Sequence, residues 1–81
     1  MKIRVRLFAS YREAFACDEL ALEVPEGTTC AVVQDRLATE RPTLERWRPV
    51  VRYGINQRFV SADTTLAEGD ELVLIPPVSG G

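Results

Sequence analysis

The sequence predicts a single α+β domain, a roll in which one main helix lies across one face of a β-sheet. Apolar and polar residues alternate over residues 2–9 and again over 19–24, as in half-buried strands. Apolar residues recur with helical spacing over residues 30–40. An apolar run at residues 72–75 ends at two prolines, which indicates a buried strand and its end. The predicted order of elements is β, short α, β, α, β, β, β, and this order favours helices gathered on one face.

The first predicted strand, at residues 2–9, is expected to turn Ile3, Val5 and Leu7 toward the core. Phe8 falls on the other side of the strand, in phase with its charged residues. A single exposed phenylalanine is ordinary, but its position makes it a candidate contact residue.

A short helix is predicted for residues 10–16, because Ser10 and Glu13 have the spacing of a capping box. A second strand is predicted for residues 19–24, and the turn at 25–27 is expected to return the chain antiparallel to the first strand. The short helix is expected to turn three side chains inward: Tyr11, Ala14 and Phe15.

The main helix is predicted over residues 30–40, capped by Thr28 or Thr29 and ended by Pro42. Its apolar stripe consists of Cys30, Val33 and Leu37. Its solvent-exposed side is expected to hold Gln34, Asp35, Arg36 and Glu40. Beyond the helix, Trp47 is interpreted as covering an edge of the core, with a partner contact as the less favoured alternative.

Three further strands are predicted at residues 50–56, 59–60 and 71–75. Gly54 inside the first of these indicates a bulge or close packing. In the last strand, Leu72 and Leu74 are expected on one face and Val73 and Ile75 on the other. The sheet face without a helix stays open, and three apolar residues are placed there as a binding patch: Phe8, Phe59 and Ile75.

The composition excludes several functional classes. A length of 81 residues and a formal net charge of −2 predict one small domain without a nucleic-acid-binding surface. No apolar run approaches the length of a membrane span, and the alternating start is unlike a signal or transit peptide. We therefore expect a cytoplasmic protein that binds neither nucleic acid nor membrane.

The sequence offers no catalytic or metal-binding set of its own. It has no histidine, which removes the commonest metal ligand and the usual base for a serine or cysteine nucleophile. Cys17 and Cys30 match no metal or redox spacing and are expected to be small buried apolar residues. No glycine-rich phosphate loop is present, so we expect no metal and no cofactor bound by the chain itself.

Residues 76–81, Pro-Pro-Val-Ser-Gly-Gly, are predicted to form an extended arm. Proline cannot continue a sheet ladder, and six extended residues span about 20 Å. Glycines Gly80 and Gly81 suit a narrow pocket on another protein, because they let the backbone approach closely. A frayed end is the alternative, but it explains the two prolines and the valine poorly.

Three segments carry a resemblance to a known family. They read Asn-Gln-Arg-Phe-Val at 56–60, Leu-Ala-Glu-Gly-Asp-Glu at 66–71 and Ile-Pro-Pro-Val-Ser-Gly-Gly at 75–81. Together with Leu-Phe-Ala at 7–9 followed by Arg-Glu at 12–13, they resemble the MoaD family of ubiquitin-like sulfur carriers, the small subunits of molybdopterin synthase. The resemblance spans the whole chain, although residues 41–49 match nothing specific.

The resemblance implies a β-grasp (ubiquitin-like) fold and a cycle of sulfur transfer. An adenylating enzyme uses ATP to activate Gly81, a sulfur donor converts it to a thiocarboxylate, and the large synthase subunit receives the tail. The sulfur is then transferred to cyclic pyranopterin monophosphate to build molybdopterin for the molybdenum cofactor. The family's synthase is a heterotetramer with two carriers.

On this view Gly81 is the reactive residue, and the residues that thread into the partner are Gly80, Ser79, Val78, Pro77 and Pro76. The partner interface is the apolar patch of Phe8, Phe59 and Ile75. Arg12 is a candidate for an ion pair at its rim and is equally consistent with a solvated helix charge.

Three alternatives remain. The sulfur could go to another acceptor, in thiamine thiazole synthesis or tRNA thiolation, although the Pro-Pro-Val-Ser-Gly-Gly ending argues against both. The chain could instead be a protein modifier that attaches Gly81 to lysines. It could also be a non-conjugating interaction module that has kept the fold.

Overall fold

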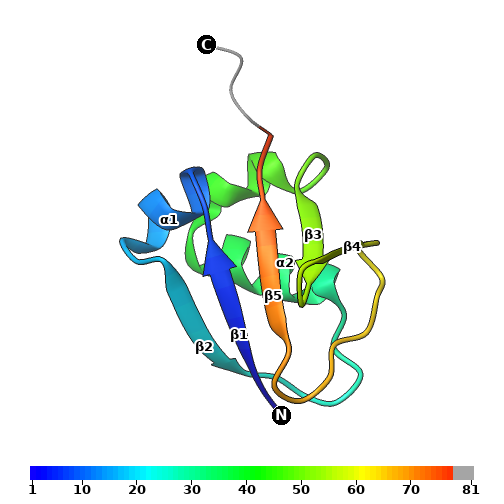
Figure 1. Ribbon diagram of the computed structural model, residues 1–81. Helices are drawn as coiled ribbons and strands as arrows, with labels where there is room; N and C mark the ends of the chain where they lie inside the picture. The colour runs from blue at the N-terminus through cyan, green and yellow to red at the C-terminus, as the bar shows by residue number, and fades with distance from the viewer. Residues whose placement is uncertain (78–81) are drawn as a thin grey trace.

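The computed structural model describes residues 1–77, which form one mixed sheet covered by helices on one face (Figure 1). The elements are β1 (Lys2–Leu7), α1 (Ser10–Phe15), β2 (Glu19–Glu23), α2 (Cys30–Glu40), the 3₁₀ helix η1 (Pro42–Trp47), β3 (Arg52–Ile55), β4 (Arg58–Val60) and β5 (Glu71–Ile75). The predicted α+β roll is confirmed.

The sheet has the strand order β2-β1-β5-β3-β4. β1 pairs antiparallel with β2 and parallel with β5, and β3 pairs antiparallel with both β5 and β4. β5, the last strand within residues 1–77, therefore lies at the centre of the sheet, and its end points away from the body of the domain (Figure 1).

The core lies between the sheet and the helices. The inward residues predicted for β1 are buried: Ile3, Val5 and Leu7 are at most 2% exposed. Leu72 and Leu74 of β5 are fully buried beside them, as period-two alternation requires. The α2 stripe of Cys30, Val33 and Leu37 packs onto this layer, at 0–1% exposure.

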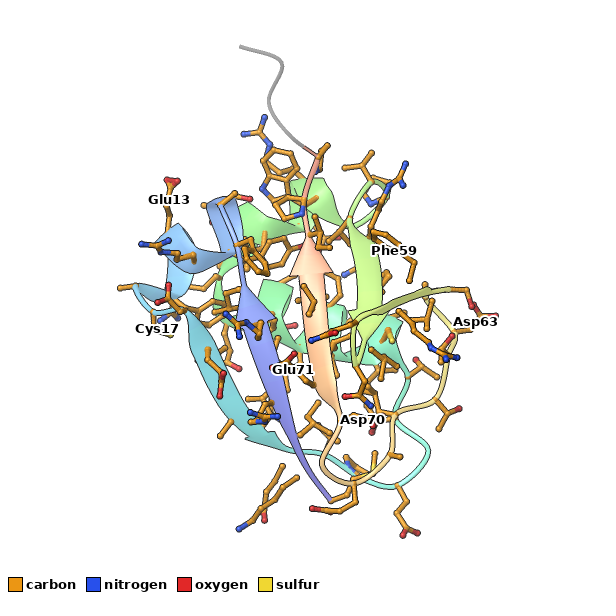
Figure 2. All side chains as sticks on the ribbon, in the orientation of Figure 1. Glu13, Cys17, Phe59, Asp63, Asp70 and Glu71 are labelled. Carbon is orange, nitrogen blue, oxygen red and sulfur yellow. The ribbon has the colours of Figure 1, made fainter. Side chains whose placement is uncertain are left out.

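Two of the segments that carry the family resemblance meet where β5 begins (Figure 2). Asp70 accepts hydrogen bonds from the Ala67 amide at 2.8 Å and from the Asn56 side-chain amide at 3.1 Å. Asn56 in turn accepts from the Glu71 amide at 3.1 Å. This network joins the turn before β5 to the β3–β4 hairpin and fixes the position of the strand from which the tail departs.

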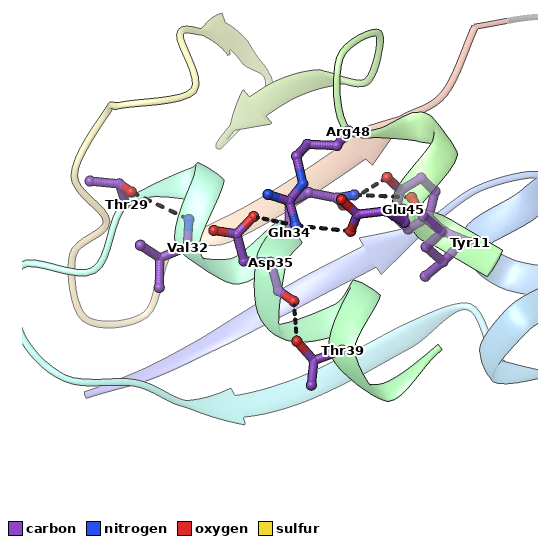
Figure 3. Close-up of polar contacts among 9 residues, drawn as sticks. Tyr11, Thr29, Val32, Gln34, Asp35, Thr39, Glu45 and Arg48 are labelled. Atoms are coloured by element: carbon purple, nitrogen blue, oxygen red, sulfur yellow. Dashed lines mark hydrogen bonds and ion pairs between the residues drawn. The ribbon is translucent and has the colours of Figure 1, made fainter. Parts of the chain in front are cut away.

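The predicted cap of α2 is confirmed, with Thr29 as the capping residue. Its hydroxyl accepts a hydrogen bond from the Val32 amide at 3.4 Å (Figure 3). The helix ends at Glu40, immediately before Arg41 and Pro42, as the residue before a proline usually requires. Pro42 then begins η1, a helix that the sequence analysis missed.

Gln34 was placed on the solvent-exposed side of α2, and this prediction is wrong. It is fully buried: its side-chain oxygen accepts from the Tyr11 hydroxyl at 2.7 Å, and its amide donates to the Leu44 carbonyl at 3.3 Å (Figure 3). Position 34 lies four residues after Cys30 and three before Leu37, so helical spacing puts it on the apolar stripe. The buried amide is tolerated because it is hydrogen-bonded, and it ties α2 to α1 and η1.

Replacing Tyr11 with phenylalanine is expected to destabilise the domain. The change leaves the buried Gln34 oxygen without a donor, which costs about 1–3 kcal/mol. The midpoint temperature of thermal unfolding should therefore fall by several degrees, since about 1 kcal/mol shifts the midpoint of such a domain by about 4–8 °C. Tyr53→Phe is the matched control, because the Tyr53 hydroxyl makes no hydrogen bond to another residue in 1–77. Equal midpoints for the two variants would contradict the role assigned to Gln34.

The capping box predicted at Ser10 is absent. Ser10 is the first residue of α1 and its hydroxyl, although buried, has no hydrogen-bond partner among the described residues. The helix begins instead from a tight turn in which the Phe8 carbonyl accepts from the Tyr11 amide at 3.1 Å. Ala9 adopts a φ of 50° in this turn, a conformation that L-residues rarely take.

The turn at residues 25–27 does not make the predicted chain reversal. The segment containing α1 already reverses the chain between β1 and β2. Residues 25–27 instead carry the chain from β2 toward α2, with Gly27 at a φ of 87°.

Gly54 marks close packing rather than a bulge. It pairs in regular register with Phe59 on one side and Val73 on the other. A Cβ at this position would lie 3.4 Å from the Arg58 carbonyl oxygen. The missing side chain leaves a depression on the open face between β4 and β5.

Candidate functional site

The root of the predicted tail is part of the folded domain. Pro76, directly after β5, is buried, and Pro77 is exposed. These two prolines, here called the tail root, are therefore anchored at the domain surface and continue in line with the end of β5 (Figure 1). Val78, Ser79, Gly80 and Gly81, the other predicted tail residues, lie outside the described residues.

The structure brings the three predicted interface residues together around Ile75. Ile75 and Phe59 line one depression of about 140 Å³, which has Gly54 in its lining. Ile75 and Phe8 line another hollow of about 550 Å³ beside the tail root. Phe59, labelled in Figure 2, is 73% exposed and Phe8 is 43% exposed, so two large apolar side chains remain uncovered in this part of the domain. The sequence predicted these residues, but not the depression over Gly54.

Strand register explains why these residues share one face. Phe59 pairs with Gly54, which pairs with Val73 on β5. Ile75 lies two residues beyond Val73, so its side chain points to the same side of the sheet. Phe8 follows Leu7, whose pairing partner is Leu74 of β5, so it comes level with Ile75.

Arg12 does not line either of these hollows. Its guanidinium lies 3.0 Å from the Asp18 carboxylate, and both side chains are largely exposed. An exposed pair of this kind contributes little to stability, so Arg12 remains available to exchange partners.

The structure adds two residues that the sequence analysis did not place in the site. Trp47 packs against the core, as predicted, and also lines the 550 Å³ hollow next to Phe8. Val50, 49% exposed, lines a second hollow of about 520 Å³ on another side of the tail root, together with Arg52. No periodic signal in the sequence could reveal this, because both residues lie in the irregular segment around η1.

Within residues 1–77, no cluster of histidine, cysteine, aspartate and glutamate side chains is arranged to hold a metal ion. In the same part of the chain, no helix is long and apolar enough to cross a membrane. The hollows beside Pro76 and Pro77 are lined mainly by apolar side chains, with Glu13 in one lining and Arg52 in the other.

The two cysteines are expected to differ in reactivity. Burial raises the pKa of the Cys30 thiol to about 11, whereas Cys17 is half-buried. Since the thiolate is the nucleophile, iodoacetamide at pH 8 should alkylate Cys17 in the folded chain and Cys30 only after unfolding. Peptide mass mapping with and without denaturant measures this; equal labelling of both thiols in the folded chain would contradict it.

The same shift predicts a loss of folding stability at high pH. The pKa of the Cys30 thiol is higher in the folded chain than in the unfolded chain, so the unfolded chain loses this proton first as the pH rises. The free energy of unfolding should therefore fall between about pH 9 and pH 11.

Comparison with known proteins assigns the chain to a family. The model of the ThiS family matches residues 5–81, nearly the full length. The chain belongs to the ThiS family. Its curated relatives include the molybdopterin synthase sulfur carrier subunit of Arabidopsis thaliana, 36% identical over 81 residues that cover 100% of this chain and 84% of the relative. The protein of the same name from Mycobacterium tuberculosis is 36% identical over 84 residues, with 100% and 99% covered. The resemblance to molybdopterin synthase small subunits is thereby confirmed.

Solved structures similar to this ThiS family chain confirm the β-grasp fold. SAMP1 from Haloferax volcanii superposes with a TM-score of 0.83 at 28% identity, covering 100% of both chains. A putative molybdopterin converting factor, subunit 1, from Pyrococcus furiosus gives 0.81 at 27% identity, covering 96% and 99%. A ubiquitin from Caldiarchaeum subterraneum gives 0.65 at 23% identity, covering 100% and 98%, which supports the ubiquitin-like architecture.

Proposed function

We propose that this chain is the sulfur carrier subunit of a cytoplasmic molybdopterin synthase and that Gly81 carries the sulfur. The observation that supports this most directly is the near-complete alignment with curated carrier subunits of that name. The apolar surface around Ile75 adds a physical reason, because a carrier must dock on proteins that supply the active sites it lacks.

The proposed chemistry takes place at the Gly81 carboxyl group. A carboxylate resists nucleophiles, so an adenylating enzyme first joins it to AMP from ATP and releases pyrophosphate. Hydrosulfide released by a sulfur donor then attacks the acyl carbon, AMP leaves, and a thiocarboxylate remains. Thiocarboxylate sulfur is a soft nucleophile suited to forming the carbon–sulfur bonds of molybdopterin on cyclic pyranopterin monophosphate. Two sulfur atoms are required, consistent with two carriers in a heterotetramer.

The large synthase subunit is the proposed partner, and the apolar patch is proposed to hold it. Ordering each tail residue costs about 1–2 kcal/mol, and fully burying an exposed large apolar side chain returns about 1.5–3 kcal/mol. Phe59, 73% exposed, can therefore return more than Phe8, 43% exposed. Pro76 is already buried in the free domain, so its ordering adds no cost on binding. The patch is proposed to provide favourable apolar contacts that offset the cost of ordering the tail, while the tail delivers the reactive atom.

Intact mass spectrometry tests the proposal. A chain ending at Gly81 is incubated with ATP, an adenylating enzyme and a sulfur donor, with a reaction lacking ATP as control. Exchange of one oxygen for sulfur adds about 16 Da at the terminus, as covalent carrier chemistry requires. The added mass should disappear when the large subunit and cyclic pyranopterin monophosphate are supplied. Loss of the sulfur only to a thiazole synthase or a tRNA-thiolating enzyme would assign the chain to another acceptor.

A role as a protein modifier is the second candidate, because a structure similar to this chain is that of H. volcanii small archaeal modifier protein 1, at 25% identity. Denaturing gels of cell extract, probed for the chain, separate the two functions. The sulfur-carrier proposal expects a single band. A ladder of adducts that requires Gly81 would favour the modifier.

A further inference from the structure

The tail root is flanked by two separate hollows, and both have Ile75, Pro76 and Pro77 in their lining. The first, of about 550 Å³, is completed mainly by Phe8 and Trp47. The second, of about 520 Å³, is completed by Val50 and Arg52. Each hollow thus has the beginning of the tail as one wall and the body of the domain as the other.

A protein that encloses the tail must enter these hollows. Under the proposed function the residues after Pro77 enter an active site of the partner, so the entrance to that site comes close to Pro76 and Pro77. Since Pro76 is buried and cannot extend further from the domain, the rim of the entrance comes to lie against Trp47 on one side and Val50 on the other.

Charged residues make the two hollows different from each other. Glu13 borders the hollow of Trp47, and Arg52 borders the hollow of Val50. Both side chains are exposed and neither forms an ion pair with another residue in 1–77. Glu13 projects outward at the end of the domain from which the tail departs (Figure 2). A complementary entrance therefore has a basic side chain toward Glu13 and an acidic one toward Arg52.

We propose that Trp47 and Val50 form a collar that seats the channel entrance of the large subunit. Two apolar ridges of the large subunit are proposed to occupy the hollows. The ridge beside Trp47 carries a basic residue, and the ridge beside Val50 carries an acidic residue. The collar fixes how deep the tail inserts and in which orientation the two proteins meet. This inference rests on the proposed function, because it identifies further contacts of the same partner.

Two valines with nearly equal exposure provide a matched test. Val50 in the collar is 49% exposed, and Val32 on α2, which covers the other face of the sheet, is 51% exposed. Val50→Asp is expected to weaken binding to the large subunit about 30-fold or more, because it places an unpaired carboxylate against an apolar ridge. Val32→Asp should bind as the unchanged chain does. Titration calorimetry with the full-length chain and large subunit measures both, and thermal unfolding checks that both variants fold.

Two further variants test the other wall and the charges. Trp47→Ala should also weaken binding about 30-fold, and Trp47→Phe should restore most of the affinity, because a ring refills the hollow. Arg52→Glu should slow association about 3-fold or more at low salt, with a smaller difference at high salt. If the unchanged chain binds and transfers sulfur while Val50→Asp and Trp47→Ala bind equally well, the collar is wrong. If the unchanged chain itself neither binds nor transfers sulfur, the proposed function is wrong.

Discussion

A chain extended by one alanine after Gly81 is expected to bind the large subunit and to transfer no sulfur. The proposed docking surface around Ile75 lies in the folded domain and is untouched by the extension. The added residue moves the carboxyl group by about 3.3–3.6 Å and places a Cβ at the end of the tail. Misplacing a reacting atom by about 1 Å already costs about 100-fold in rate, so the transfer should fall below detection.

Binding and chemistry are measured separately on the same protein, so that each serves as a control for the other. Calorimetry reports the affinity for the large subunit, and product formation reports sulfur transfer. A Gly81→Ala chain keeps the length and adds only the Cβ. Its rate of sulfur transfer should lie between that of the unchanged chain and that of the extended chain. Transfer at the ordinary rate from the extended chain would refute a mechanism that depends on the Gly81 carboxyl group.

Replacing Phe59 with aspartate should weaken docking on the large subunit at least about 30-fold without unfolding the domain. Phe59 is 73% exposed in the free chain, so its replacement removes almost no packing within the domain. In the complex, a central aromatic anchor is worth about 2–4 kcal/mol, or about 30- to 1,000-fold in affinity. A buried carboxylate without a partner adds to that loss.

Phe59→Leu is the matched variant, because leucine keeps an apolar side chain over Gly54. It should bind within a few-fold of the unchanged chain and show the same unfolding temperature. Weak binding by both variants would indicate a need for an aromatic ring. Unimpaired binding by Phe59→Asp would show that the open face of the sheet is not the docking surface.

The elements with strong periodicity could be predicted from the sequence, and the exceptions have identifiable causes. β1, β5 and the stripe of α2 follow from apolar spacing alone. Gln34 was misplaced because its residue type was given more weight than its position on that stripe. Ser10 was misassigned because the preceding turn begins the helix through backbone hydrogen bonds, which a capping pattern does not report.

The candidate site was only partly accessible from the sequence. The patch of Phe8, Phe59 and Ile75 followed from placing strand faces, which depends on period two. The depression over Gly54 depends on two neighbouring strands meeting in one register, which a single sequence does not specify. Trp47 and Val50 reach the tail root through η1 and the segment after it, where the chain path follows no period.

Because β5 lies at the centre of the sheet, the domain is expected to fold only after residues 71–75 have been synthesised. A nascent polypeptide that has not yet delivered residues 71–75 lacks the strand that joins β1 to β3, so its sheet remains in two separate halves. Pairing between strands so distant in sequence slows folding. A product truncated before residue 71 is therefore expected to stay unfolded and open to proteolysis, and not to compete with the full chain for the partner.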